Sequence, residues 1–262
     1  DGLKLLIMPS PYYVTEDEAA ALDAWVRAGG VLLTEAHLAG YNGTTGRHSR
    51  ILPGCGLAAS WGIREADSTS SYHLRLPERQ AVAGPLPPDV EKALHAMGTQ
   101  GARFYPIRLA DGSYAWGASR YAILEGDALT PEGSFDGTHP CLASKHVDDG
   151  TVFYCGANLG EGALNGGAGL RAVLARCASL AGVTPTLNAR AARPGVLHVD
   201  ALGAPPGPRF LVVLSRSDGP EELSLEAPGV WAGLFSGTNW ELGATATVTV
   251  PPGFADLLVA VR

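Results

Sequence analysis

Two side chains that could exchange protons follow a short apolar run near the start of the chain. Glu35 and His37 come directly after residues 31–34, a run that predicts a buried strand. A carboxylate and an imidazole in one cleft would support general acid–base catalysis by a small hydrolase. No Ser or Cys nucleophile and no G-x-S-x-G motif accompany them. Polar residues that only anchor the loop are therefore the favoured interpretation of this position.

Glycoside hydrolysis is a second chemistry to weigh, and it needs two carboxylates flanking a sugar ring. The available glutamates are Glu35, Glu65, Glu125 and Glu161. No motif ties any two of them together, so solvated loop carboxylates are favoured over a catalytic pair.

Aromatic side chains could bind sugar by stacking. Trp61 and Trp116 join Glu35 and His37 as candidate ligand-binding residues. Trp231 and Trp240 could form the platform of a carbohydrate-binding module. Core packing is the competing explanation for each indole, since most tryptophans are buried.

Metal, cofactor and disulfide chemistry have little support. The seven histidines are scattered and show no ligand spacing. His73 alternates with leucines in a predicted strand, so a surface imidazole is the favoured interpretation there. The four cysteines form no C-x-x-C pair and are expected to be buried free thiols. The glycine-rich stretch 156–169 matches no phosphate-binding motif, and a simple connection is favoured. We expect no cofactor and no metal.

The elements that would position these residues begin with a βαβ unit. Residues 3–8 and 31–34 read as buried strands of a parallel sheet. Between them Thr15 and Glu18 form a capping box that opens a helix over 16–28, and Gly29-Gly30 ends it. The crossover should be right-handed.

Loops and hairpins follow. Residues 40–56 read as a long loop and 57–61 as a short helix closed by Gly62. Hairpins are expected over 102–118 and 141–156, around Asp-Gly turns. An amphipathic helix over 170–180 then ends at Gly182.

Beyond residue 195 only strand periodicity remains, which predicts a small β-sandwich. We place the domain boundary near residue 190. The expected strands are 196–202, 209–215, 223–226, 230–235, 245–250 and 254–261.

Composition narrows the function classes. The 262 residues carry 19 Lys+Arg against 26 Asp+Glu, a net charge of −7, which argues against nucleic acid and membrane surfaces as partners. No apolar run approaches the roughly 20 residues of a membrane span, and no signal peptide is evident. A cytoplasmic location is expected. Because the first strand starts almost at once, we expect the chain to be a piece of a longer protein.

The order of these elements and their local sequences resemble a known family. The matching segments are LKLLIMPSPYYVTEDEAAALDAWVRAGGVLLTEAHLAG and ILPGCGLAASWGIRE, then residues 140–155 and the helix that leads to GVTP at 182–185. Together they resemble the trimerisation domain of family 42 β-galactosidases, and the all-β tail is similar to the small sandwich that follows it.

The resemblance implies a fold and an organisation. It implies an α/β, class I glutamine-amidotransferase-like (flavodoxin-like) doubly wound sheet over residues 1–190 and a small all-β sandwich over 191–262. True amidotransferases place Cys at the elbow and His and Glu after a late strand. Here the corresponding stretches are 35–37 and 156–160, and they lack those residues.

The resemblance also implies a role. In that family the catalytic glutamates belong to a preceding (β/α)8 barrel, which needs roughly 250 residues of its own. This chain would then serve subunit assembly, as a homo-oligomer with a trimer expected, and would help wall the barrel's galactoside pocket. A carbohydrate-binding module and a small hydrolase using His37 with Glu35 stay open as alternatives.

Overall fold

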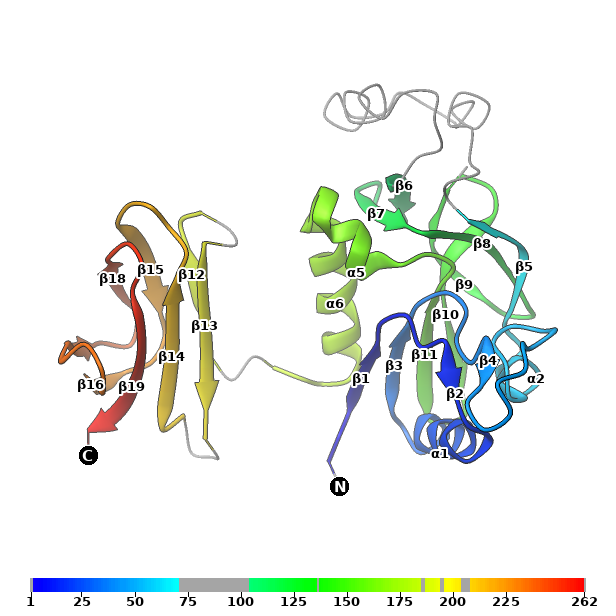
Figure 1. Ribbon diagram of the computed structural model, residues 1–262, viewed down its shortest axis with the longest axis horizontal. Helices are drawn as coiled ribbons and strands as arrows, with labels where there is room; N and C mark the ends of the chain where they lie inside the picture. Colours follow the sequence, from blue (N-terminus) through cyan, green and yellow to red (C-terminus); the bar gives the residue numbers. More distant parts are fainter. Residues whose placement is uncertain are drawn as a thin grey trace. The chain divides into compact units, whose positions relative to one another are not determined.

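The computed structural model describes residues 2–70, 104–135, 137–184, 187–193, 196–203 and 208–261 (Figure 1). The chain divides into two units, Asp1–Val183 and Thr184–Arg262. The sequence places the boundary near residue 190. The strand expected around His73 lies outside the described residues.

The first unit is built on a seven-stranded sheet with the order β1-β3-β11-β10-β9-β6-β7. Its parallel part contains β1 (Leu5–Met8), β3 (Val31–Thr34) and β11 (Gly150–Cys155). Its antiparallel part contains β10 (Pro140–Val147), β9 (Thr130–Ser134), β6 (Phe104–Leu109) and β7 (Tyr114–Ala118). Two small pairs flank it, β2 (Tyr13–Val14) with β4 (Tyr41–Asn42) and β5 (Arg64–Ser70) with β8 (Arg120–Glu125).

The predicted βαβ unit is confirmed. Helix α1 (Glu16–Arg27) connects the parallel strands β1 and β3. The Thr15 hydroxyl accepts a hydrogen bond from the Glu18 amide, and the Glu18 carboxylate accepts one from the Thr15 amide at 2.8 Å. This capping box satisfies two amides that the helix itself cannot.

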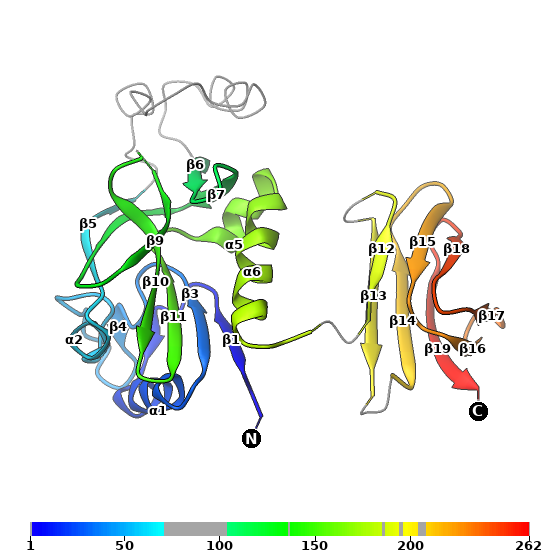
Figure 2. The same ribbon diagram turned by 180° about the vertical axis from the view of Figure 1, so that it is seen from behind.

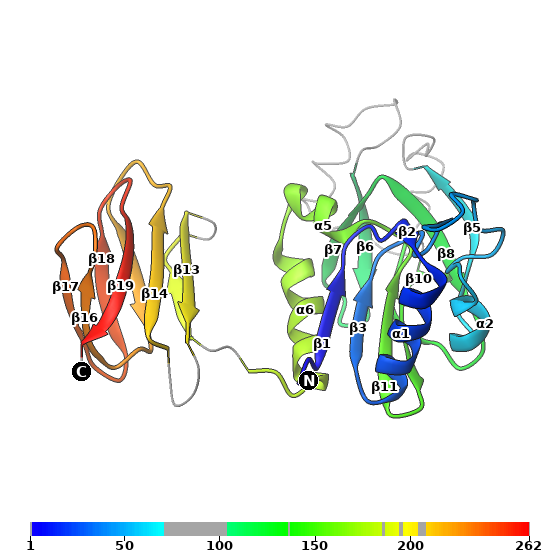
Figure 3. The same ribbon diagram turned by 60° about the horizontal axis from the view of Figure 1, so that its bottom comes forward.

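Helices cover both faces of the parallel strands (Figure 3). Leu32 packs with Leu22 and Val26 of α1, while its neighbour Leu33 packs with Val173 of α6 (Ala168–Leu180). Because successive side chains on a strand point to opposite faces, an unbroken apolar run is what a strand buried on both sides requires.

The doubly wound, glutamine-amidotransferase-like fold expected for residues 1–190 is wrong. Only three of the seven strands run parallel, and the rest form a curled antiparallel extension. A parallel neighbour needs a crossover of a dozen or more residues. Here a short turn containing Asp111 joins β6 to β7, and Asp148 and Asp149 join β10 to β11, so the chain returns antiparallel.

The two predicted hairpins, the short helix α2 (Leu57–Trp61) and helix α6 are confirmed. Gly62 and Gly182 adopt positive φ angles just beyond α2 and α6, as the sequence predicts for helix ends. The other helical segments among the described residues, α5 (Leu159–Gly162) and a 3-10 turn (Ala163–Asn165), lie within the glycine-rich stretch.

The second unit contains two antiparallel sheets that share one apolar core (Figure 2). One contains β12 (Ala189–Ala191), β15 (Glu221–Leu225) and β18 (Ala246–Val250). The other contains, in this order, β13 (Leu197–Leu202), β14 (Phe210–Ser215), β19 (Ala255–Val261), β16 (Gly229–Gly233) and β17 (Asn239–Leu242). The six expected strands all coincide with described strands, while β12 and β17 are additional.

Gly150 marks the tightest backbone contact between α1 and the sheet. A Cβ added there would lie 1.9 Å from the Val26 carbonyl oxygen and 2.5 Å from that of Gly30. Both neighbours are main-chain atoms, so relief requires the backbone to shift.

We therefore expect Gly150→Ala to lower the free energy of unfolding by about 1–3 kcal/mol, the usual cost of overpacking. Urea unfolding followed by the helical circular dichroism signal measures it, since the described helices all belong to the first unit. Gly219→Ala is the control, because nothing lies within 4 Å of its added Cβ. Equal midpoints for the two variants would contradict the packing argument.

Candidate functional site

Polar side chains gather where the three parallel strands end. Glu35 is 5% exposed and follows β3. One carboxylate oxygen accepts hydrogen bonds from the Ser10 amide at 2.9 Å and hydroxyl at 3.2 Å, and the other accepts from the Gly160 amide at 2.7 Å. Glu35 thus joins the ends of β1 and β3 to α5.

His37 lies beside Glu35 in sequence but has a different set of partners. Its backbone adopts a φ of 64°, and its amide donates to the Glu65 carboxylate. Its ring Nε2 is 2.9 Å from the Ser68 hydroxyl and 3.5 Å from Glu65 Oε2. Burial lowers the pKa of His37 to about 4, with the charges of Arg120 and His48 acting in the same direction. The imidazole is therefore neutral at pH 7.

Glu65, on β5, is the buried acid of this group. Its Oε1 accepts a hydrogen bond from the Tyr154 hydroxyl at 2.7 Å, and that hydroxyl in turn accepts from the Leu38 amide at 3.3 Å. Its Oε2 has no hydrogen-bond partner within the part of the chain that the structure describes. Burial raises the pKa of Glu65 and also raises the pKa of Tyr154 well above its usual range.

This geometry limits what Glu35 and His37 can do together. Both oxygens of Glu35 are taken by donors from its own loops, and His37 bonds to Glu65 and Ser68. The arrangement ties segments together and offers a neutral imidazole beside a buried carboxyl group. A ligand-binding role for either residue stays a prediction.

The other glutamates considered for glycoside chemistry are dispersed. Glu125 is exposed and paired with Arg64, while Glu161 contacts the Ser119 hydroxyl. No group of three or more His, Cys, Asp or Glu side chains that could hold a metal ion occurs among the described residues.

The four candidate tryptophans are core residues. The Trp61 indole N–H donates a hydrogen bond to Asp23 at 2.7 Å. The Trp231 indole N–H donates one to the Ala227 carbonyl at 2.8 Å. Trp240 stacks on Phe254. Trp116 is the most exposed of the four, at 9%. Since a stacking platform needs an open ring face, the structure does not favour any of them as one.

The glycine-rich stretch is explained by close backbone packing. A Cβ at Gly156 would lie 2.0 Å from the Ala122 carbonyl oxygen, and one at Gly162 would lie 1.9 Å from that of Trp116. These glycines allow α5 to approach β7 and β8, which accounts for them without a phosphate.

Sequence reasoning did not single out Ser10, Ser68, Arg120 or Tyr154, although all belong to this group. Ser10 lies two residues after the first strand, and this position is a usable signal. Arg120 lies over the Tyr12 ring at 5.7 Å, and Tyr154 lies inside a buried strand. Only the side-chain hydrogen bond in the folded structure shows that Tyr154 faces Glu65.

Comparison with known proteins adds a structural likeness. No protein-family model and no curated protein sequence matches the chain. Among solved structures, β-galactosidase from Bacillus circulans sp. alkalophilus superposes with a TM-score of 0.66 at 16% identity, over 98% of this chain and 33% of its own. The chain has the fold of a part of this β-galactosidase.

Two further β-galactosidases give the same result. A GH42 enzyme from G. stearothermophilus has a TM-score of 0.64 at 16% identity and covers 99% of this chain with 32% of its own. The enzyme from the Antarctic haloarchaeon Halorubrum lacusprofundi has a TM-score of 0.61 at 19% identity, over 98% and 31%. The chain thus spans about a third of the length of these proteins, and the likeness is one of fold.

None of the helices in the described part of the chain has the length and hydropathy that a membrane span requires.

The shifted His37 has a consequence for stability. An unfolded histidine takes up a proton near pH 6.5, whereas folded His37 resists protonation down to about pH 4. Acidification through this window therefore favours the unfolded state, and the loss should be about 1–2 kcal/mol between pH 7 and pH 5. Glu65, whose pKa is raised, acts in the opposite sense.

We expect His37→Gln to lose less stability than the unaltered chain between pH 7 and pH 5, measured by urea unfolding at both values. His146→Gln, at an exposed position on β10, should keep the full loss. Identical pH dependence in His37→Gln and the unaltered chain would refute a buried neutral imidazole.

Proposed function

We propose that this chain is the non-catalytic C-terminal region of a β-galactosidase-like glycoside hydrolase. The observation that carries the proposal is the asymmetric coverage: 98–99% of this chain corresponds to only 31–33% of the β-galactosidases. A (β/α)8 barrel elsewhere in the parent protein would supply the catalytic glutamates.

The polar group at the strand ends supports this division of labour. Nucleophilic or acid–base glutamates need a carboxylate that can reach the sugar. Glu35 has both oxygens occupied, and Glu65 is buried beneath His37 and Tyr154. These carboxylates brace loops that would form part of the wall of a neighbouring sugar pocket.

The proposed role of the first unit is assembly, as a trimer. An aromatic patch made of Tyr13, Tyr41 and His48 supports it. Tyr13 is 70% exposed and stacks on Tyr41 with 5.2 Å between ring centroids, and His48 meets Tyr41 edge-on at 5.0 Å. Exposed aromatic clusters of this kind are typical of protein interfaces. In a closed threefold ring, each heterologous contact between neighbouring subunits should bury at least about 1,000 Å² of surface.

Two measurements on the purified chain test the proposal. It should give no turnover of aryl galactosides, and a rate like that of a complete β-galactosidase would refute the non-catalytic role. Light scattering should give about three times the 27.1 kDa chain mass.

A matched pair of variants connects the assembly to the patch. Tyr13→Ser with Tyr41→Ser should shift the trimer toward monomer, because it removes exposed aromatic area without touching a core. Phe235→Ser, at a phenyl ring 79% exposed in the second unit, should leave the mass unchanged. A monomeric unaltered chain, or a trimer indifferent to the double substitution, would contradict the assembly proposal.

A further inference from the structure

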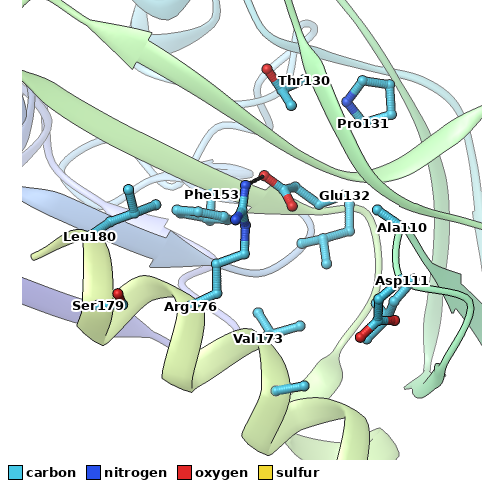
Figure 4. A pocket seen from close by; sticks show the side chains of 13 residues that line it. Ala110, Asp111, Thr130, Pro131, Glu132, Phe153, Val173, Arg176, Ser179 and Leu180 are labelled. Atoms are coloured by element: carbon cyan, nitrogen blue, oxygen red, sulfur yellow. Dashed lines mark hydrogen bonds and ion pairs between the residues drawn. The ribbon is translucent and has the colours of Figure 1, made fainter.

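A groove in the first unit lies between α6 and the antiparallel part of the sheet. It encloses about 580 Å³, within the range of pockets that bind small organic molecules. Figure 4 shows it from close by, with Val173, Arg176 and Leu180 of α6 facing Glu132 of β9 and Asp111 of the β6–β7 turn. Leu142 and Phe153 belong to its apolar lining.

A buried carboxylate opens onto this apolar groove. Glu132 is 7% exposed. Its Oε1 accepts hydrogen bonds from the Ser144 hydroxyl at 2.7 Å and from the Arg176 guanidinium at 2.8 Å. Both contacts fall on the same oxygen, Oε1. The second oxygen, Oε2, belongs to a side chain that lines the groove, and a carboxylate oxygen can accept a hydrogen bond from a donor bound there.

The charges along the groove indicate which donor fits. Its ionisable lining residues are Glu132, Asp111 and Arg176, for a net charge of −1. The single cation already bonds to Glu132, which raises the pKa of Arg176. Hydrogen bonds from the Ser113 hydroxyl and amide lower the pKa of Asp111, so this carboxylate at the mouth is ionised. The two carboxylates would repel an anionic ligand, whereas a cationic ligand would be attracted by both.

We propose that this groove binds a small organic amine, with its ammonium group bonded to Glu132 Oε2 and its apolar body against Val173 and Leu180. Arg176 holds the Glu132 carboxylate from the side, and Asp111 adds a second negative charge to the ammonium environment. The site does not involve Glu35 or His37 and is independent of the proposed role in a glycoside hydrolase.

Benzylamine is the probe, and benzyl alcohol is its neutral control of nearly the same shape. Titration of the full chain, followed by amide NMR shifts, should show saturable benzylamine binding in the roughly millimolar range, with shifts at Val173, Arg176 and Leu180. Benzyl alcohol should bind at least about tenfold more weakly, because a charge-assisted hydrogen bond is lost.

Variants that are expected to change the affinity for benzylamine in opposite directions make the test specific. Glu132→Gln should weaken benzylamine binding at least about tenfold, and Asp111→Asn, at the exposed mouth, should weaken it less. Arg176→Met should strengthen it, because Glu132 loses its resident cation. Glu125→Gln, at an exposed carboxylate outside the groove, should change nothing.

Three outcomes would overturn the proposal. They are no saturable binding of benzylamine at about 10 mM, equal binding of the alcohol and the amine, or unchanged affinity in whichever of the variants Glu132→Gln and Asp111→Asn fold. Because Asp111 is exposed, its variant keeps the test decisive even if Glu132→Gln fails to fold.

Discussion

The Glu35 carboxylate is the contact on which the polar end of the parallel strands depends. It accepts hydrogen bonds from Ser10 beyond β1 and from Gly160 in α5, and so connects segments 25 and 125 residues away in sequence. These donors are what a carboxylate that is only 5% exposed requires. Because both of its oxygens accept hydrogen bonds from the protein's own loops, Glu35 holds these loops together. The neighbouring pair of His37 and Glu65 lies beside the segments that Glu35 connects.

The antiparallel extension creates the second distinctive feature of the first unit. Strands β9, β10 and β6 form the antiparallel part of the sheet, while α6 packs on β3 and β7. Glu132, held by the Ser144 hydroxyl, faces α6 across the groove that this arrangement leaves. A sheet with helices alternating along its length would have filled the same space. The groove and the departure from a doubly wound fold therefore have the same topological origin.

Local elements could be predicted from the sequence because local chemistry determines them. The Thr15 and Glu18 capping box, the apolar run at residues 31–34 and the turn at Asp148 and Asp149 each act within a few residues. The order of strands in the sheet depends instead on which distant segments pair. The Asp-Gly turns predict the hairpins β6–β7 and β10–β11, but no local pattern shows that β9 lies between β6 and β10 or that β11 pairs with β3.

The candidate site was predictable only in part, for a related reason. Glu35 and His37 were found because polar residues after a buried strand stand out. Tyr154 lies in a strand whose every residue is buried, so its hydroxyl bond to Glu65 cannot be distinguished from core packing in the sequence. The tryptophans show the same limit, since an indole that stacks on sugar and one that fills a core have the same local signature.

Amide hydrogen exchange in Glu35→Gln tests the central claim most directly, namely that this carboxylate braces the strand ends. A glutamine side chain keeps the shape but gives up one acceptor oxygen and the negative charge that strengthens both bonds. The account predicts that the Ser10 and Gly160 amides exchange at least about tenfold faster in the variant, while Leu32 and Val152 within the sheet keep their protection. Unchanged exchange at both Ser10 and Gly160 would contradict it.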